Sequence, residues 1–330
     1  MKLSVLALDY DGTIARDDRL DPAVRDAIVE ARRRGVKVML VTGRTLTDLQ
    51  RVAGELNFVD GVVAENGAIV HFPDGGLTAP LAPPLPPAFA AGLEKRGIRF
   101  AAGECLVDAD ASAAPLMLEV IRELELPIVL VFNRSRVMAL TQGISKATGL
   151  SAALEMLRAS PRNAVAVGDA ENDHELLRLA EVGAAVAWGS SSLRGTADIV
   201  INGSGPAAVG DFIRSVAASG RLPVPVRARR RLTLGHTADG REFSLAVRGR
   251  NMLIMGETNS GKSWLAGLLC ERFILHVQSL RHRPGGGLPD ARRASRRQSA
   301  RRRRWPAHSS RAAPRAALPG PQRGHRPLLH

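Results

Sequence analysis

The chain has 330 residues, 45% of them hydrophobic, and a formal net charge of +14 at pH 7. That length allows one large domain or two ordinary ones with a sizeable core. Residues 276–330 hold 14 Arg, no Lys and a single acid, Asp290, so this tail carries nearly all of the excess positive charge. The body of the chain is near neutral, which removes the argument that its surface binds nucleic acid or an anionic membrane.

The cysteine count and the hydropathy pattern both indicate a soluble, cytoplasmic protein. Cys105 and Cys270 are too few for a metal cluster, and we expect two buried thiols rather than a disulfide. Acids interrupt the apolar N-terminus too soon for a signal-peptide core. No run of the sequence approaches the roughly 18 apolar residues that a membrane span needs.

Short apolar runs alternate with helical periodicity, beginning with a predicted buried strand at 3–10. A helix follows over 20–35, with Asp21 as its N-cap, Pro22 at its first position and Gly35 as its stop. Buried strands separated by helices predict a Rossmann-like parallel sheet in an α/β fold. The further strands are predicted at 36–41, 61–65, 163–168, 184–188 and 197–201, and the further helices at 45–56 and 173–181.

Residues 81–137 break this rhythm and predict a small α+β insert that lies over the sheet. The stretch LAPPLPPAF has the composition of a linker, and two or three strands with one helix at 117–126 follow it. We therefore expect a core made of 1–80 and 138–215, with the insert at 81–137 and a linker at 216–231.

Polar side chains follow several of the predicted strands. Ligands of parallel α/β sheets bind at the carboxyl ends of the strands, so these groups are expected to converge. They are Asp9, Asp11, Thr42 and Asp169, with Asn172 and Asp173 one turn later and Lys146 at the start of another helix. Three carboxylates and a lysine at one sheet edge are costly unless a hard cation such as Mg²⁺ offsets their repulsion.

This set of groups suits phosphoryl chemistry. A carboxylate can attack phosphorus to give an aspartyl-phosphate, while a metal and a lysine neutralise the phosphoryl oxygens. A second carboxylate can protonate the leaving oxygen and later activate water. Because alternate residues of an extended chain point the same way, Asp9 and Asp11 are expected to reach one substrate.

Four segments resemble, in order, the motifs of the haloacid dehalogenase (HAD) superfamily. They are LALDYDGT at 6–13, VTGR at 41–44, the lysine of SKATGL at 145–150 and VGDAENDHELL at 167–177. The sequence is most similar to the superfamily's phosphatases with a C2-type cap inserted between the second and third motifs. The resemblance covers roughly residues 1–215, including VAENGAIV at 63–70.

The resemblance implies a role for each matching residue. Asp9 is the nucleophile and Asp11 the general acid and base, and Asp11 also argues against dehalogenation. Thr42, Gly43 and Lys146 bind the phosphoryl group, and Asn172 orders Lys146 or the substrate. Mg²⁺ is held by Asp9, the Asp11 carbonyl and Asp169, with support from Asp173.

The implied reaction is Mg²⁺-dependent hydrolysis of a phosphate monoester. A small cap favours a small phosphorylated metabolite, such as a sugar phosphate or phosphoglycolate. Phosphoryl transfer to an acceptor other than water uses the same residues, so only product analysis separates the two reactions.

A second motif occurs at GETNSGKS, residues 256–263, between a predicted strand at 252–255 and a predicted helix at 264–273. It fits the phosphate-binding loop of P-loop NTPases, with ATP as the candidate ligand. The expected nucleotide-binding residues are Gly256, Gly261, Lys262 and Ser263. We expect residues 232–275 to be a truncated NTPase-like segment, because no second acidic strand follows Ile274.

The segment leaves an alternative function open. The chain can be an ATP-binding or nucleic-acid-associated module in which the phosphatase is secondary, and ATP binding lost on Lys262→Ala would support it. The tail at 276–330 is either a disordered basic arm that binds nucleic acid through phosphates or the product of a shifted reading frame. A one-base shift with permitted codons turns Leu280–Ala291 into an apolar strand ending in acids, which the P-loop segment lacks.

Overall fold

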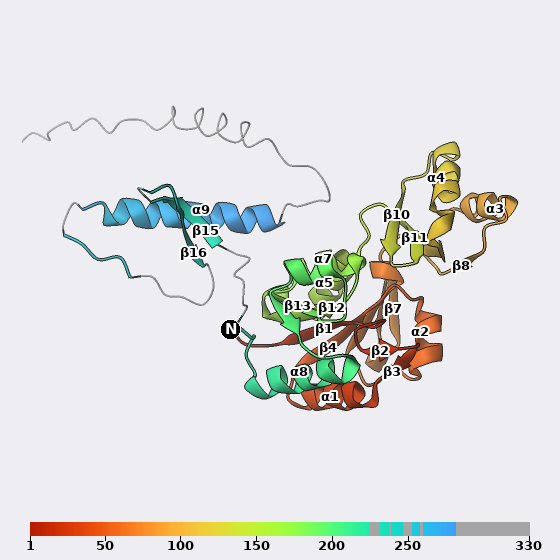
Figure 1. Cartoon of the computed structure of the whole chain (residues 1–330), viewed down its shortest axis with the longest axis horizontal. Coiled ribbons are helices and arrows are strands. Elements are labelled where there is room, and N and C mark those ends of the chain that lie inside the picture. The colour runs from red at the N-terminus through yellow and green to blue at the C-terminus, as the bar shows by residue number, and fades with distance from the viewer. Residues whose placement is uncertain (225–230, 238, 247–252, 258–259, 282–330) are drawn as a thin grey trace, which may run out of the picture. The chain divides into compact units, whose positions relative to one another are not determined.

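An eight-stranded sheet is the framework of residues 1–201 in the computed structural model, which describes residues 1–224, 231–237, 239–246, 253–257 and 260–281 (Figure 1). Its strand order is β14-β13-β12-β1-β4-β5-β6-β7. The strands from β14 to β5 run parallel, and β6 and β7 add an antiparallel edge. The predicted parallel α/β sheet is therefore confirmed. The strands are β1 Val5–Asp9, β4 Lys37–Val41, β5 Gly61–Ala64, β6 Ile69–Phe72, β7 Leu77–Pro80, β12 Ala164–Gly168, β13 Val182–Val186 and β14 Ile199–Ile201.

Helices cover both faces of this sheet, which explains why its central strands are apolar throughout. Leu6 and Leu8 of β1 belong to the core on one face, and Val5 and Ala7 belong to the core on the other. Figure 1 shows α1 and α8 together on one side of the sheet and α5 and α7 on the opposite side. The first layer holds α1 Pro22–Arg33, α2 Leu46–Ala53 and α8 Pro206–Ser219; the second holds α5 Lys146–Met156, α6 His174–Leu179 and α7 Ser191–Thr196.

The predicted ends of the first helix are confirmed in detail. Asp21 caps α1, because its carboxylate accepts a hydrogen bond from the Ala23 N–H at 2.8 Å. Pro22 occupies the first turn, where its missing N–H costs nothing. Gly35 follows the helix with a φ of +82°, a conformation that favours glycine.

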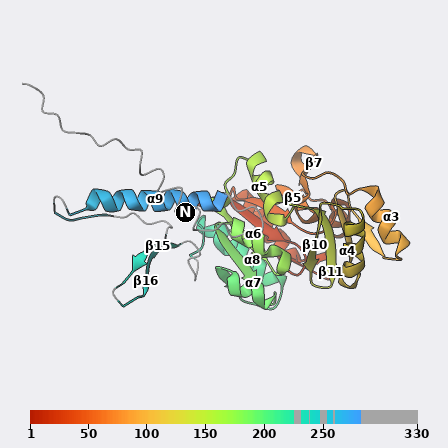
Figure 2. The same cartoon turned by 90° about the horizontal axis from the view of Figure 1, so that it is seen from above.

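The insert between the second and third motifs is a separate antiparallel sheet in the order β10-β11-β9-β8, with its own apolar core. Figure 2 shows β10, β11, α3 and α4 gathered at one end of the core sheet. It has four strands and two helices, more than the sequence predicted. The proline-rich stretch is only partly a linker, because α3 begins at Pro87. The side chains of Phe89 and Leu93 on this helix are buried in the insert core. The elements are α3 Pro87–Lys95, β8 Phe100–Ala102, β9 Leu106–Asp110, α4 Ala114–Glu123, β10 Ile128–Asn133 and β11 Arg136–Thr141.

Short elements complete the first 219 residues. They are the hairpin strands β2 Ala15–Arg16 and β3 Arg19–Leu20 and the 3₁₀ turns η1 Glu65–Gly67, η2 Pro73–Gly75, η3 Ala111–Ala113, η4 Pro161–Asn163 and η5 Glu171–Asp173. Two of these turns, η1 and η5, lie at the carboxyl ends of strands and contribute residues to the site described below.

The C-terminal part of the chain departs from the sequence-based expectation. The strands β15 Arg231–His236 and β16 Glu242–Ala246 form an antiparallel hairpin, and α9 runs over Lys262–Arg281, past the predicted helix end at 273. The strand predicted at 252–255 is wrong over its described residues 253–255. Leu253 and Met255 are 81% and 79% exposed there, and no described strand pairs with them.

The cysteines, the linker and the tail were also subjects of sequence-based expectations. Cys105 is buried as expected, but Cys270 is exposed, because it lies on α9, where most of the described side chains are exposed. The predicted basic linker residues 225–230 and the tail residues 282–330 lie outside the described residues. Within the described part of the chain, no helix is long and apolar enough to cross a membrane.

Candidate active site

A buried lysine joins two carboxylates at the carboxyl edge of the sheet. Asp9 ends β1, Lys146 begins α5 and Asp173 ends η5, so three separate elements supply the three side chains. The Lys146 ammonium donates to Asp9 Oδ1 and to Asp173 Oδ1, each at 2.6 Å. All three residues are buried, with exposed fractions of 4% or less. The sequence predicted that these groups converge, and the structure brings them into direct contact.

Asp173 also holds the loop that carries Asp169. Its second oxygen accepts hydrogen bonds from the backbone N–H groups of Asp169 and Ala170, at 2.9 and 3.1 Å. Asp169 in turn accepts a hydrogen bond from the Thr13 hydroxyl at 3.4 Å and forms an ion pair with Arg134 of the insert. Asp173 therefore orients both the lysine and the neighbouring carboxylate.

The carboxylates of this cluster fit a divalent cation. Asp9, Asp169 and Asp173 each offer an oxygen, and the three oxygens lie within 4.8 Å of one another. Asp9 Oδ2 is buried and has no hydrogen-bond partner, so it is an open acceptor in a place where open acceptors are costly. A hard cation with oxygen ligands would satisfy it and reduce the repulsion between the three acids.

Burial and charge shift the pKa values of the central pair. Burial raises the pKa of Asp9 to about 7; the charge of Asp173 adds to the rise, and Lys146 opposes it. Burial acts against the charge of Lys146, but Asp173 and Asp9 together outweigh burial and raise its pKa above the ordinary value. The lysine is therefore fully charged at neutral pH, whereas Asp9 titrates near neutrality without a metal.

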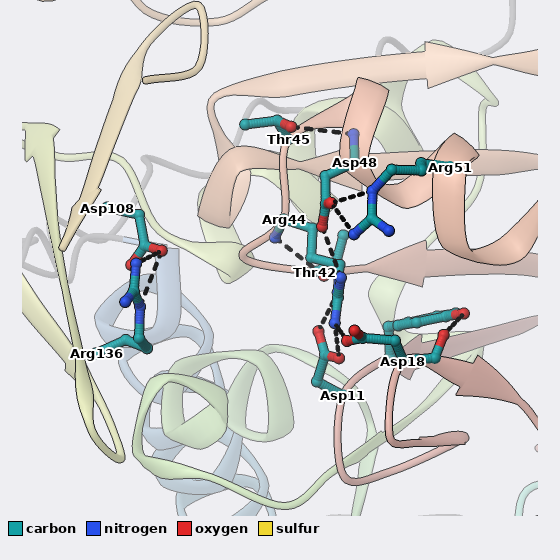
Figure 3. A network of polar contacts seen from close by, with 10 residues as sticks. Asp11, Asp18, Thr42, Arg44, Thr45, Asp48, Arg51, Asp108 and Arg136 are labelled. Atoms are coloured by element: carbon teal, nitrogen blue, oxygen red, sulfur yellow. Dashed lines mark hydrogen bonds and ion pairs between the residues drawn. The ribbon is translucent and has the colours of Figure 1, made fainter. Parts of the chain in front are cut away.

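Asp11 belongs to a second cluster, built around Arg44 of the VTGR segment (Figure 3). The Arg44 guanidinium binds Asp11 in a bidentate pair, with Nε–Oδ2 2.8 Å and Nη2–Oδ1 2.7 Å. It also pairs with Asp18 and, at 2.6 Å, with Asp48. Asp9 and Asp11 thus have different polar partners, Lys146 and Arg44, although the charge of Asp11 still adds to the rise in the pKa of Asp9.

Thr42 and Gly43 follow the end of β4, directly before Arg44, and Gly43 lies close to the insert. Thr42 is fully buried, and its hydroxyl accepts a hydrogen bond from the Arg44 N–H at 3.1 Å. A Cβ on Gly43 would lie 3.2 Å from the sulfur of Met138 in β11. The glycine therefore lets a strand of the insert approach the end of β4.

The turn η1 contributes three residues to which the sequence analysis assigned no role. Glu65 accepts hydrogen bonds from the backbone N–H groups of Glu104 and Cys105 in the insert, at 2.9 and 2.7 Å. Asn66 Oδ1 accepts a hydrogen bond from Asn172 at 3.2 Å. Gly67 approaches the start of α5 so closely that an added Cβ would lie 2.0 Å from the Ser145 carbonyl oxygen.

The local sequence Glu-Asn-Gly is compatible with a turn of positive φ, and this pattern could have predicted η1. Glu65 and Asn66 have φ values of +50° and +54°, and Gly67 has +112°; asparagine and glycine are the residues that tolerate this region best. Asn172 was expected to order Lys146 or the substrate. Its amide N–H donates to Asn66, and its Oδ1 is buried without a hydrogen-bond partner, so its expected role stays a prediction.

The predicted nucleotide-binding residues lie in the C-terminal segment. The Lys262 ammonium donates to the carbonyl oxygens of Gly256, at 2.7 Å, and of Glu257. Gly261 has a φ of +84°, and Ser263 is in the first turn of α9. Two carbonyl oxygens at the start of the loop thus accept hydrogen bonds from the Lys262 ammonium.

Comparison with known proteins agrees with the fold and the order of the motifs. The sequence profile of the haloacid dehalogenase-like hydrolases matches residues 6–80 and 112–213. The chain is 32% identical over 212 residues to a phosphoglycolate phosphatase of Natronomonas pharaonis, covering 60% of this chain and 91% of that one. It is 28% identical over 230 residues to a phosphoglycolate phosphatase of Methanopyrus kandleri, covering 64% and 97%.

A solved structure shows the same fold. A haloacid dehalogenase-like hydrolase from Bacteroides thetaiotaomicron superposes with a TM-score of 0.57 at 16% identity, covering 65% of this chain and all of that one. With the profile match over more than half of the residues, these similarities confirm the predicted family and the prediction of an enzyme. The chain belongs to the haloacid dehalogenase-like hydrolase family.

Proposed function

We propose that this HAD-family phosphatase hydrolyses small phosphate monoesters through an aspartyl-phosphate on Asp9, with Mg²⁺ as its cofactor. The observation that carries the proposal is the hydrogen bonding of the two carboxylate oxygens of Asp9. One of its oxygens is fixed by Lys146 at 2.6 Å, and the other is buried, unpaired and next to two further acids. An anchored carboxylate with one free oxygen is suited to attack phosphorus.

The residues divide the reaction into two balanced steps. In the first, Asp9 Oδ2 forms a bond to phosphorus while the bond to the leaving oxygen breaks, and Asp11 gives a proton to that oxygen. In the second, Asp11 takes a proton from water, the water oxygen bonds to phosphorus, and the bond to Asp9 breaks. Inorganic phosphate leaves, and both acids return to their starting states.

The other side chains hold the phosphoryl group and orient the reacting acids. The Lys146 charge and the Thr42 and Gly43 segment bind phosphoryl oxygens, and Arg44 positions Asp11 through its bidentate pair. Asn172, whose Oδ1 is free, contributes on the substrate side. These roles follow from the positions of the residues and from the match of their motifs to the family.

Mg²⁺ would be held by the carboxylates of Asp9 and Asp169 and the main-chain carbonyl of Asp11, with Asp173 in support. When bound, such a cation neutralises charge on the phosphoryl oxygens. The three acids fit the cation because their oxygens already lie within 4.8 Å of one another.

The cap and the relatives both favour a small substrate. We assign the insert to the C2 type, because it is an α+β sheet placed between the second and third motifs. Its Met138 and Arg134 come close to Gly43 and Asp169, which leaves little room for a bulky leaving group. Because the relatives from Natronomonas and Methanopyrus are phosphoglycolate phosphatases, phosphoglycolate and sugar phosphates are the first substrates to test.

The domain bounds predicted from the sequence shift with the elements, because β11 carries the cap to Thr141 and α8 carries the core to Ser219. We therefore propose a core at 1–80 and 142–219, a cap at 81–141, a linker after Ser219 and an NTPase-like segment that begins with β15 and ends near 275. The family match ends at residue 213, so it does not extend to this last segment. Nucleotide binding at Lys262 stays a prediction from the sequence, as does a role for the tail in nucleic-acid binding.

Phosphate release tests the proposed reaction. We expect turnover of an aryl phosphate and of phosphoglycolate that requires Mg²⁺ and falls at least about 1,000-fold in Asp9→Asn, since the amide cannot act as the nucleophile. Adding glycerol as an acceptor and analysing the products separates hydrolysis from phosphoryl transfer. Metal-dependent turnover that survives in Asp9→Asn would refute the proposal.

A further inference from the structure

A cap arginine contacts a carboxylate that the proposed metal also needs. Arg134 lies in the turn between β10 and β11, and its guanidinium forms an ion pair with Asp169 Oδ2. The Asp169 side chain is 1% exposed, whereas the Arg134 side chain is 56% exposed. An exposed cap side chain therefore contacts a carboxylate that is itself buried in the core.

The position of this guanidinium is well defined by its neighbours. A Cβ on Gly12 would lie 2.8 Å from Arg134 Nη2 and 2.4 Å from Asp169 Oδ2, so the ion pair lies directly on the turn after Asp11. The Arg134 backbone N–H donates to Glu171 Oε2 at 3.4 Å, and its φ of +53° belongs to the tight hairpin turn. The hairpin thus presents one positive side chain to the centre of the site.

The ion pair and a metal on Asp169 compete for the same carboxylate. A divalent cation repels a guanidinium at contact distance, so occupation of the metal site favours release of Arg134 from Asp169. The hairpin backbone still holds the freed arginine at the mouth of the site. On the loop that faces the cap, Glu171 is exposed and already accepts a hydrogen bond from the Arg134 N–H.

A guanidinium in this place suits a substrate that carries a second anionic group. The phosphoryl group of the proposed reaction lies against Asp9 at the floor of the site, so the rest of the substrate extends toward the cap. Arginine binds carboxylates in a bidentate, planar arrangement that lysine and neutral groups do not match. The only other arginine described in the same hairpin, Arg136, is already paired with Asp108 within the cap (Figure 3).

We propose that Arg134 is a specificity-determining residue that exchanges Asp169 for a carboxylate of the substrate when the metal binds. The inference rests on the proposed phosphatase function and narrows its substrate class to short phosphorylated acids. Arg134 then has two successive partners, a protein carboxylate in the metal-free enzyme and a substrate carboxylate in the loaded one.

The first experiment measures metal binding without substrate. Calorimetric titration of Mg²⁺ compares the wild-type chain with Arg134→Gln and with the matched variant Arg136→Gln, which removes the same charge from the same hairpin. We expect Arg134→Gln to bind Mg²⁺ about tenfold more tightly, because it removes a competing cation from Asp169. Equal affinity of Arg134→Gln and the wild type would overturn the exchange.

The second experiment measures discrimination between two substrates of nearly equal size, 2-phosphoglycolate and 2-hydroxyethyl phosphate, which lacks the carboxylate. We expect the ratio of their kcat/KM values to fall about 10- to 100-fold in Arg134→Gln, through KM, because a charge-assisted hydrogen bond is lost. Arg134→Lys should restore part of the ratio. An unchanged ratio, or the same fall in Arg136→Gln, would overturn the assignment to Arg134.

The two experiments separate this inference from the phosphatase proposal. A wild-type enzyme that cleaves both phosphates with Mg²⁺, and loses both with Asp9→Asn, upholds the phosphatase whatever Arg134 does. A wild-type protein that cleaves neither refutes the proposed function, and the specificity role falls with it.

Discussion

Replacing Lys146 by Met tests how the buried charges of the site are balanced. Methionine has a similar length, so the change removes the ammonium and leaves little empty volume. Asp9 and Asp173 then lose the group that each contacts at 2.6 Å. Because Lys146 opposes the rise in the pKa of Asp9, its removal raises that pKa further, and Asp9 stays protonated to higher pH.

The size of the effect depends on pH in a way that the structure determines. When the pKa of an acid is higher in the folded than in the unfolded state, the free energy of unfolding falls by about 1.4 kcal/mol per pH unit as the pH rises from the unfolded to the folded pKa. In the wild type this loss ends near the folded pKa of Asp9, about 7. In Lys146→Met it continues above pH 7, so the gap between the two proteins widens above pH 7 by up to about 1.4 kcal/mol per pH unit.

Urea unfolding followed by circular dichroism at pH 6, 7, 8 and 9, without divalent cations, measures the gap. Lys95→Met is the matched control, because Lys95 is exposed at the end of α3 and its replacement changes only the net charge. The pKa of Lys146 is raised above its ordinary value, so the lysine stays charged over this range. A difference between wild type and Lys146→Met that is the same at pH 6 and pH 9 would contradict this account.

Two further predictions concern the residues around the catalytic pair. Arg44→Gln releases Asp11. We expect kcat for an alkyl phosphate, whose leaving oxygen needs a proton, to fall about 100-fold, and kcat for p-nitrophenyl phosphate to fall less than about tenfold. Equal losses of kcat for the two substrates would show that Arg44 does not act through Asp11. Gly67→Ala forces a Cβ to within 2.0 Å of the Ser145 carbonyl oxygen, so we expect a loss of stability above about 3 kcal/mol together with reduced activity. Gly76→Ala, at a φ of +61° with open space around it, isolates the backbone cost of about 1 kcal/mol, and an equally small effect at Gly67 would refute the close-packing argument.

The sequence was informative where chemistry follows from local pattern. Asp9, Thr42 and Asp169 follow apolar runs, and parallel strands bring their carboxyl ends to one edge, so their convergence was predictable. The contact between Arg134 and Asp169 was not, because the two residues are 35 positions apart and belong to different sheets. Nothing in the local sequence of the hairpin tells which part of the core the cap will face.

Other misses have equally specific causes. The bidentate pair of Asp11 with Arg44 was not predicted, because the two residues are 33 positions apart in the chain. The apolar residues Leu253 and Met255 favoured a strand, yet a strand also needs a neighbour to bond with, and periodicity does not report one. The α3 helix was hidden by prolines that are compatible with a helix only at its start.

The three consecutive residues of η1 each contact a different part of the molecule. Glu65 binds the cap backbone, Asn66 binds the loop that carries the metal-site acids, and Gly67 abuts the helix that begins with Lys146. One short turn is therefore a mechanical junction between cap, loop and lysine. Because the three residues are consecutive, a displacement of the cap that pulls on Glu65 would act within two residues on the loop of Asn172 and on the start of α5.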